Sequence, residues 1–145
     1  MNARAPVAAL AALVAAGLVY GLWPKQKLSP EQEIRALVAR AVKSAEARDP
    51  SGVVDELAEG FRGPSGTGAQ DVKRLLLGQF FGAKQIVVLN PSLEVTVASP
   101  TSGHFKGVFV FARDGADLEA SKYEIEADLS SDTGRWKITS ASWNR

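Results

Sequence analysis

The sequence predicts an α+β domain in which three helices precede a meandering antiparallel sheet, behind one apolar N-terminal segment. Apolar residues recur at helical spacing between positions 29 and 81, and from Lys84 onward they alternate with polar residues at a period of two. Three helices followed by such strands are typical of a two-layer domain with the helices on one face of the sheet. We therefore divide the chain into an anchor and linker, residues 1–28, and one domain, residues 29–145.

The N-terminal segment, residues 6–23 (PVAALAALVAAGLVYGLW), contains no charged residue. As a helix it would measure roughly 27 Å, close to the hydrocarbon thickness of a bilayer. Tyr20 and Trp23 fall where interfacial aromatic residues are common. We expect one transmembrane helix that acts as a signal anchor and binds the lipid bilayer, with the domain outside the cytoplasm, which in a bacterium means the periplasmic side of the inner membrane.

A cleaved secretory signal peptide is the alternative, and it would leave a secreted product. Cleavage after Ala16 or after Gly21 fits the small-residue rule for such sites. The apolar run is longer than the ~7 to 15 residues of a typical signal core, which favours the uncleaved anchor.

Composition excludes several classes of function. The 17 Lys and Arg residues and the 16 Asp and Glu residues alternate along the chain, and the net charge is +1, so no basic patch for nucleic acid is expected. The chain has no Cys, which excludes disulfides, thiolate metal sites and thiol nucleophiles. No phosphate-binding glycine loop, nucleophile-elbow motif or metal-ligand spacing occurs, and we expect neither a cofactor nor a metal.

The first helix begins at a capping box, Ser29-Pro30-Glu31-Gln32, and is expected to end near Arg48, before Asp49-Pro50. Its apolar stripe consists of Ile34, Leu37, Val38, Ala41, Val42 and Ala45.

A second, short helix is expected from Ser51 to about Glu59, followed by a loop from Gly60 to Gly68 that is rich in glycine. The third helix should run from Ala69 to about Phe81. Its predicted inner face consists of Val72, Leu75, Leu76, Gln79 and Phe80.

The remaining segments are predicted strands. Residues 85–89 and 92–99 form either a strand pair or one long bent strand interrupted at Asn90-Pro91, because Pro cannot donate into a ladder. Three further strands should follow, over residues 104–113, 118–130 and 135–143, with turns at residues 100–103, 114–115 and 132–134.

The closing run, residues 134–143 (GRWKITSASW), has a G-x-W-x-I pattern and a final Trp. Together with the order of the helices and with Phe61-Arg62 after the second helix, it resembles the nuclear transport factor 2-like (NTF2-like, or SnoaL-like) superfamily over residues 29–145. The resemblance implies a cone-shaped fold of the cystatin-like type, in which a curved sheet wraps round the helices and encloses a possible cavity. It implies no particular activity, because members include isomerases, dehydratases, epoxide hydrolases, accessory subunits and many proteins with no known role.

Alternation along residues 118–130 separates an apolar from a charged face. Tyr123, Ile125, Ala127 and Leu129 point one way, and Lys122, Glu124, Glu126 and Asp128 point the other. We expect the carboxylates on the solvated face, paired with Arg135 and Lys137 of the last strand.

The strand at residues 104–113 is apolar on both faces, with Phe105, Phe109 and Phe111 on one and Val108, Val110 and Ala112 on the other. One face should pack on the helices, and the other could line a cavity or a partner interface. Core packing is the default for the aromatic residues, and the single histidine has no carboxylate neighbour fixed by the sequence. The candidate pocket-lining residues are Phe61, Arg62, His104, Phe109, Phe111, Tyr123 and Trp136.

We expect no catalytic residues, and the first hypothesis is a non-catalytic interaction module or one that binds a small apolar ligand. The alternative is an isomerase-like or hydrolase-like enzyme that uses His104, or Glu124 or Glu126 in an inverted register. A third hypothesis is a homodimer formed through the sheet. A closed polar cavity would favour the enzyme, an open apolar cavity the ligand-binding module, and a filled core with a flat apolar sheet the dimer.

Overall fold

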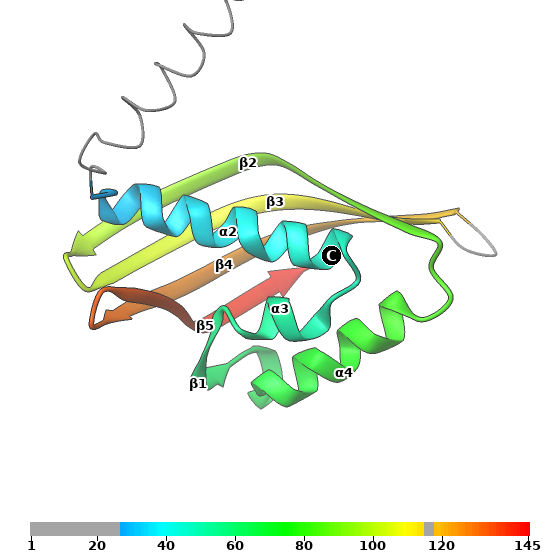
Figure 1. The fold of residues 1–145 in the computed structure, drawn as a ribbon, viewed down its shortest axis with the longest axis horizontal. Helices are drawn as coiled ribbons and strands as arrows, with labels where there is room; N and C mark the ends of the chain where they lie inside the picture. The colour runs from blue at the N-terminus through cyan, green and yellow to red at the C-terminus, as the bar shows by residue number, and fades with distance from the viewer. Residues whose placement is uncertain (1–26, 115–117) are drawn as a thin grey trace, which may run out of the picture.

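The computed structural model describes residues 27–114 and 118–145 (Figure 1). The elements are α2 (Pro30–Glu46), α3 (Pro50–Val54), β1 (Leu57–Arg62), the 3-10 turn η1 (Pro64–Gly66), α4 (Ala69–Phe80), β2 (Gln85–Ser99), β3 (Ser102–Asp114), β4 (Leu118–Asp132) and β5 (Arg135–Asn144). The predicted anchor, residues 6–23, lies outside the described residues. Within the described ranges, no helix is long and apolar enough to cross a membrane.

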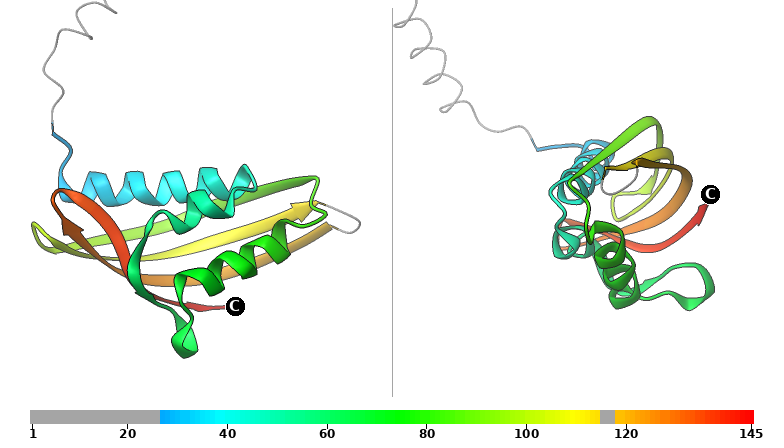
Figure 2. Two further views of the ribbon diagram at one scale, coloured as in Figure 1. Left: turned by 60° about the horizontal axis from the view of Figure 1, so that its bottom comes forward. Right: turned by 90° about the vertical axis from the view of Figure 1, so that its right-hand side faces the viewer.

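The five strands form one curved sheet in the order β1-β5-β4-β3-β2, with the helices on its concave side (Figures 1 and 2). Neighbouring long strands are antiparallel, which confirms the predicted α+β layers. Strand β1 was not predicted, and it runs parallel to β5.

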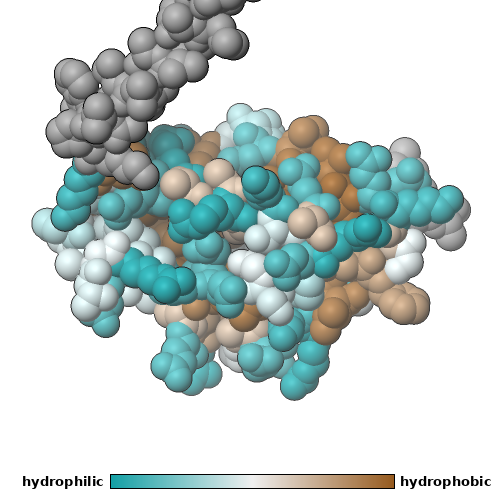
Figure 3. All heavy atoms as spheres, viewed as in Figure 1, coloured by the Kyte–Doolittle hydropathy of each residue, from teal (hydrophilic) through white to brown (hydrophobic). Residues whose placement is uncertain are grey.

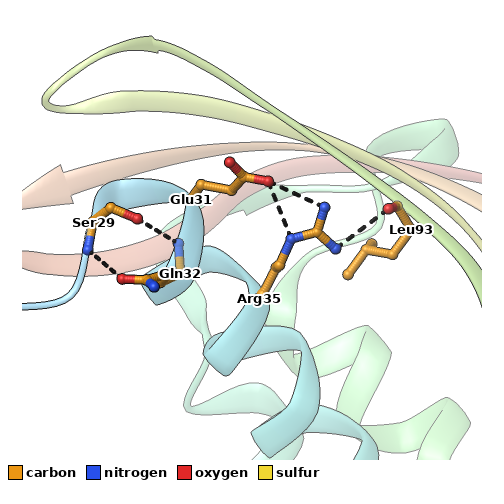
Figure 4. A network of polar contacts seen from close by, with 5 residues as sticks. All are labelled: Ser29, Glu31, Gln32, Arg35 and Leu93. Atoms are coloured by element: carbon orange, nitrogen blue, oxygen red, sulfur yellow. Dashed lines mark hydrogen bonds and ion pairs between the residues drawn. The ribbon is translucent and has the colours of Figure 1, made fainter.

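Helix α2 begins as its capping box predicts. Gln32 N donates to Ser29 Oγ at 3.2 Å, and Ser29 N donates to Gln32 Oε1 at 2.9 Å, which satisfies donors at the helix start that have no partner within the helix (Figure 4). Arg35 on the same helix bridges Glu31 and the carbonyl oxygen of Leu93 on the edge strand β2.

The predicted second helix is too long. Asp49 caps α3 by accepting from Gly52 N at 3.1 Å, but the helix ends at Val54, and residues 57–62 form strand β1. The backbone of this segment pairs with β5, and Ile138 N donates to Glu56 O at 2.9 Å. The apolar pair Leu57 and Phe61 is spaced by four residues, which places both on one side in a helix and in a strand alike, so local sequence does not separate the two structures.

Strand β2 is the single long strand of the two alternatives. Its pairing with β3 shifts register between Leu89 and Ser92, at the Asn90-Pro91 step. The Asn90 side chain spans this irregularity, because its Nδ2 donates to Ser92 O and to Val108 O, each at 2.8 Å.

The core lies between the first half of α2 and the concave face of the sheet. Ile34 and Leu37 are fully buried there, against Phe105, Leu129 and Trp136. Gly103 lets the helix approach closely, since a Cβ at this position would lie 2.6 Å from Ile34 Cδ1. A smaller cluster of Phe80, Ala83 and Ile86 holds the end of α4 against the start of β2.

The convex face carries the charged row of β4, as predicted, but its partners differ from the prediction. Lys106 Nζ lies 3.6 Å from Glu126 Oε1, and His104 Nδ1 lies 2.9 Å from Asp128 Oδ1. The predicted pairing with Arg135 and Lys137 is wrong. The tight turn at residues 133–134 places Arg135 opposite Asp132 and Lys137 opposite Ser130, at the end of β4 beyond the acidic row. Lys137 Nζ donates to Asp55 O.

Candidate functional site

A cavity of about 450 Å³ lies between the helices and the concave face of the sheet and opens to the surface. Its walls come from α2, α3, β1, α4 and the four long strands. This volume falls within the ~300–1,000 Å³ range of small-molecule pockets.

The change in side-chain size along α2 explains where the cavity lies. The first half of its apolar stripe carries the large residues Ile34 and Leu37, which fill the space above the sheet. The second half carries Ala41 and Ala45, which line the cavity and leave space beneath them.

Helix α4 forms the opposite wall and packs less closely than α2. Of its residues only Phe80 is buried, whereas Leu75 lines the cavity and remains 58% exposed. Figure 3 shows hydrophobic side chains gathered toward the right-hand side of the molecule, over the C-terminal half of α4 and the neighbouring part of β2, on a face that is otherwise largely hydrophilic. The rim of the cavity is therefore apolar on the α4 side.

The C-terminal end of α4 is held by two arginines from other elements. Arg113 Nη1 on β3 donates to Gln79 O at 3.2 Å, and Arg48 Nη1 donates to Ala83 O at 2.6 Å. Positive charge suits the carbonyl end of a helix, so these contacts fix the wall of the cavity to the sheet and to the end of α2.

The lining is almost entirely apolar. Among the described residues, no charged side chain lines the cavity, and polar side-chain atoms come only from Gln79, Tyr123 and Trp143. General acid–base catalysis needs a titratable group within hydrogen-bond reach of the substrate, and the lining places only the phenol of Tyr123 there.

Four of the seven candidate residues line this cavity: Phe61, Phe109, Phe111 and Tyr123. Trp136 is buried in the core instead, and Arg62 is exposed at the end of β1. The placement of His104 in the pocket is corrected, because it alternates with Phe105 along β3 and so points to the convex face.

His104 lies in a polar network on that convex face. Its Nδ1 is 2.9 Å from Asp128 Oδ1, and Ser140 Oγ donates to Asp128 Oδ2 at 3.1 Å. The hydrogen bond to His104 is the main cause that holds the pKa of the Asp128 carboxyl below its usual value. In the part of the chain that the structure describes, no cluster of three or more His, Asp or Glu side chains is arranged to hold a metal ion.

Sequence reasoning missed how α2 and α4 contribute to the cavity. The step from large to small residues along the α2 stripe was the available signal, as was Gln79, a polar residue on the inner face of α4. Both lie on predicted apolar faces, and a packed core explains such faces equally well.

No protein-family model matches the sequence, and no curated protein sequence matches it. Solved structures do match the fold. A hexachlorocyclohexane dehydrochlorinase of type 2 is 11% identical, with a TM-score of 0.65 over 77% of this chain and 82% of that one. The protein Aln2 from a Streptomyces species is 18% identical, with a TM-score of 0.68 over 83% of this chain and 94% of that one.

A third match is an NTF2-like protein with a cystatin-like fold from Novosphingobium aromaticivorans, 14% identical, with a TM-score of 0.61 over 77% of this chain and 78% of that one. At such identities the likeness shows the fold alone. The expected NTF2-like, cystatin-like fold is thereby supported.

Proposed function

We propose that this protein is a non-catalytic module that binds a small apolar ligand in the cavity between its helices and its sheet. The observation that carries the proposal is the lining itself: an open space of about 450 Å³ whose walls hold no charged side chain among the described residues. Removing apolar surface from water gives about 25 cal/mol per Å², so such a cavity favours an apolar occupant over a polar one.

Catalysis is less well supported. One structure with this fold is a dehydrochlorinase, so the fold is compatible with an enzyme. The residues that the enzyme hypothesis needs, however, are on the wrong side of the sheet. His104, Glu124 and Glu126 point to the convex face, away from the cavity, and the observed register of β4 leaves them there.

The proposal includes attachment to a membrane through residues 6–23, with the domain outside the cytoplasm. Its support is the length of this uncharged apolar stretch, which matches the thickness of a bilayer. An anchored domain with an apolar cavity would bind its ligand next to the bilayer.

The test is a substitution that fills the cavity. Ala41→Phe places a large side chain in the cavity from α2, and Ala39→Phe makes the same change at an exposed position of the same helix. Binding of the neutral apolar dye Nile red to the full chain is measured by fluorescence. We expect about a tenfold or greater loss of affinity in Ala41→Phe and little change in Ala39→Phe, because removing the free volume costs several apolar contacts.

The wild type and every variant contain the N-terminal segment, so dye bound to that segment contributes equally to each measurement. Circular dichroism verifies that each variant is folded, and Ala141→Phe on β5 provides a second way to fill the same space. Equal dye binding by the wild type and both cavity-filled variants would refute the proposal.

A further inference from the structure

The polar groups of the cavity lining are few, and they come from Gln79, Tyr123 and Trp143. Along β4, the lining runs from Ala127 at the buried centre of the sheet to Tyr123, four residues toward the end of the strand near α4, a span of roughly 13 Å. The inner end is closed by Leu37 and Phe105. The Tyr123 phenol lies at the other end of this span. An elongated ligand therefore has a defined direction in this cavity.

A guanidinium group lies beside Tyr123. Glu124 pairs with Asn144, and Arg145 follows β5 directly, so it lies next to Tyr123. Arg145 Cζ is 5.8 Å from the centroid of the Tyr123 ring, and Arg145 Nη2 donates to Ser121 Oγ at 3.0 Å. A guanidinium carries five N–H donors in a fork that matches a carboxylate, and this contact uses only one of them.

A second guanidinium lies at the C-terminal end of α4. Arg113 donates through Nη1 to the carbonyl oxygen of Gln79, which places this group next to the α4 wall. A negatively charged head group beside Tyr123 would be attracted by the Arg145 guanidinium, whereas a positively charged head group would be repelled by it.

We propose that the ligand is a single-chain amphiphile with an anionic head of the fatty-acid type, which places its hydrocarbon chain in the cavity and its carboxylate beside Arg145. This inference rests on the proposed function and specifies its ligand. Arg145 is exposed, so its charge is solvated in the empty protein and can form a charge-assisted hydrogen bond without a prior burial cost. The apolar lining provides the affinity, and Arg145 provides the selectivity for the head.

The test compares three ligands that share one hydrocarbon chain: dodecanoate, dodecanol and dodecyltrimethylammonium. Each displaces Nile red from the full chain, below its aggregation concentration and at a pH well above the pKa of a free carboxyl. In the wild type we expect dodecanoate to bind most tightly and the ammonium compound most weakly. In Arg145→Gln, dodecanoate should lose about tenfold in affinity while dodecanol is unchanged, because only the charged head meets the guanidinium.

Arg145→Lys should recover part of the loss, since it restores the charge without the fork. Arg62→Gln is the matched control: it removes an exposed arginine that does not line the cavity, and all three affinities should remain as in the wild type.

The outcomes separate this inference from the proposed function. Equal affinities for dodecanoate and dodecanol in the wild type, or equal losses of both in Arg145→Gln, would overturn the anionic-head inference. The proposed function would still stand if dodecanol binding is lost in Ala41→Phe and retained in Ala39→Phe. Absence of binding for all three compounds would overturn both.

Discussion

Asp128 is the residue whose ionisation the fold perturbs on the convex face. The hydrogen bond from His104 lowers the pKa of its carboxyl, the Ser140 hydroxyl acts in the same direction, and partial burial opposes both. A carboxyl with a lowered pKa stabilises the fold when it is ionised. This contribution is present above the ordinary Asp pKa of about 3.9 and is lost as the pH falls through the lower folded value.

We therefore predict that Asp128→Asn is less stable than the wild type at neutral pH and that the gap closes in acid. The side chain is 65% exposed, so solvent screening limits the effect to less than about 1 kcal/mol. Urea unfolding at neutral and acidic pH measures the free energy of unfolding. Glu124→Gln, on the same strand and face, controls for the loss of one negative charge. A difference in the free energy of unfolding that does not change with pH would contradict the lowered pKa of Asp128.

The residue scale also shows what the sequence could predict about the site. Alternation along β3 and β4 correctly separates the concave aromatic residues from the carboxylates, and the same alternation places His104 on the convex side with Val108 and Val110. This alternation suffices to predict Phe111 and Tyr123 as residues of the cavity lining. Which concave residues border an empty space and which are packed depends on how closely each helix approaches the sheet, and no local pattern specifies that distance.

At the scale of elements, α2 approaches the sheet closely at Gly103, and α4 presents Gly78 to solvent; substitutions of these two glycines test this arrangement. Gly103→Ala on β3 would place a Cβ 2.6 Å from Ile34 Cδ1 on α2, and we expect a loss of about 1–3 kcal/mol in the free energy of unfolding. Gly78→Ala within α4 meets no atom within 4 Å. It should stabilise the protein by about 0.5–1 kcal/mol, since Ala is the better helix former.

Thermal or urea unfolding of the two glycine variants gives opposite signs if α2 lies directly on the sheet and α4 presents Gly78 to open space. Destabilisation by Gly78→Ala would contradict the solvent-facing position of Gly78, and unchanged stability in Gly103→Ala would contradict the close approach of α2 to β3.

Elements with strong local signals were predicted well. The capping box defined the start of α2, and the Asp132-Thr133-Gly134 turn placed the β4–β5 hairpin, where Thr133 and Gly134 both adopt positive φ. Strand β1 was missed because Leu57 and Phe61 fit either period and because its partner, β5, lies about 80 residues away in sequence. Pairing with so distant a strand is a tertiary effect that overrides local helix preference.

At the scale of the whole molecule, the sheet curves round one closely packed and one loosely packed helix. The cavity occupies the space under the loosely packed helix and the small residues of α2. The fold is shared with enzymes, but in this chain the aromatic and aliphatic residues face the cavity and the titratable row faces outward. This placement of side chains supports the proposed binding role.

The most direct test of the binding role is native mass spectrometry of the full chain with dodecanol added, comparing the wild type with Ala41→Phe and Ala39→Phe. We predict a dissociable one-to-one adduct on the wild type and on Ala39→Phe, and none on Ala41→Phe. Adducts of equal abundance on all three proteins, or on none of them, would contradict the assignment of the cavity as a ligand-binding site.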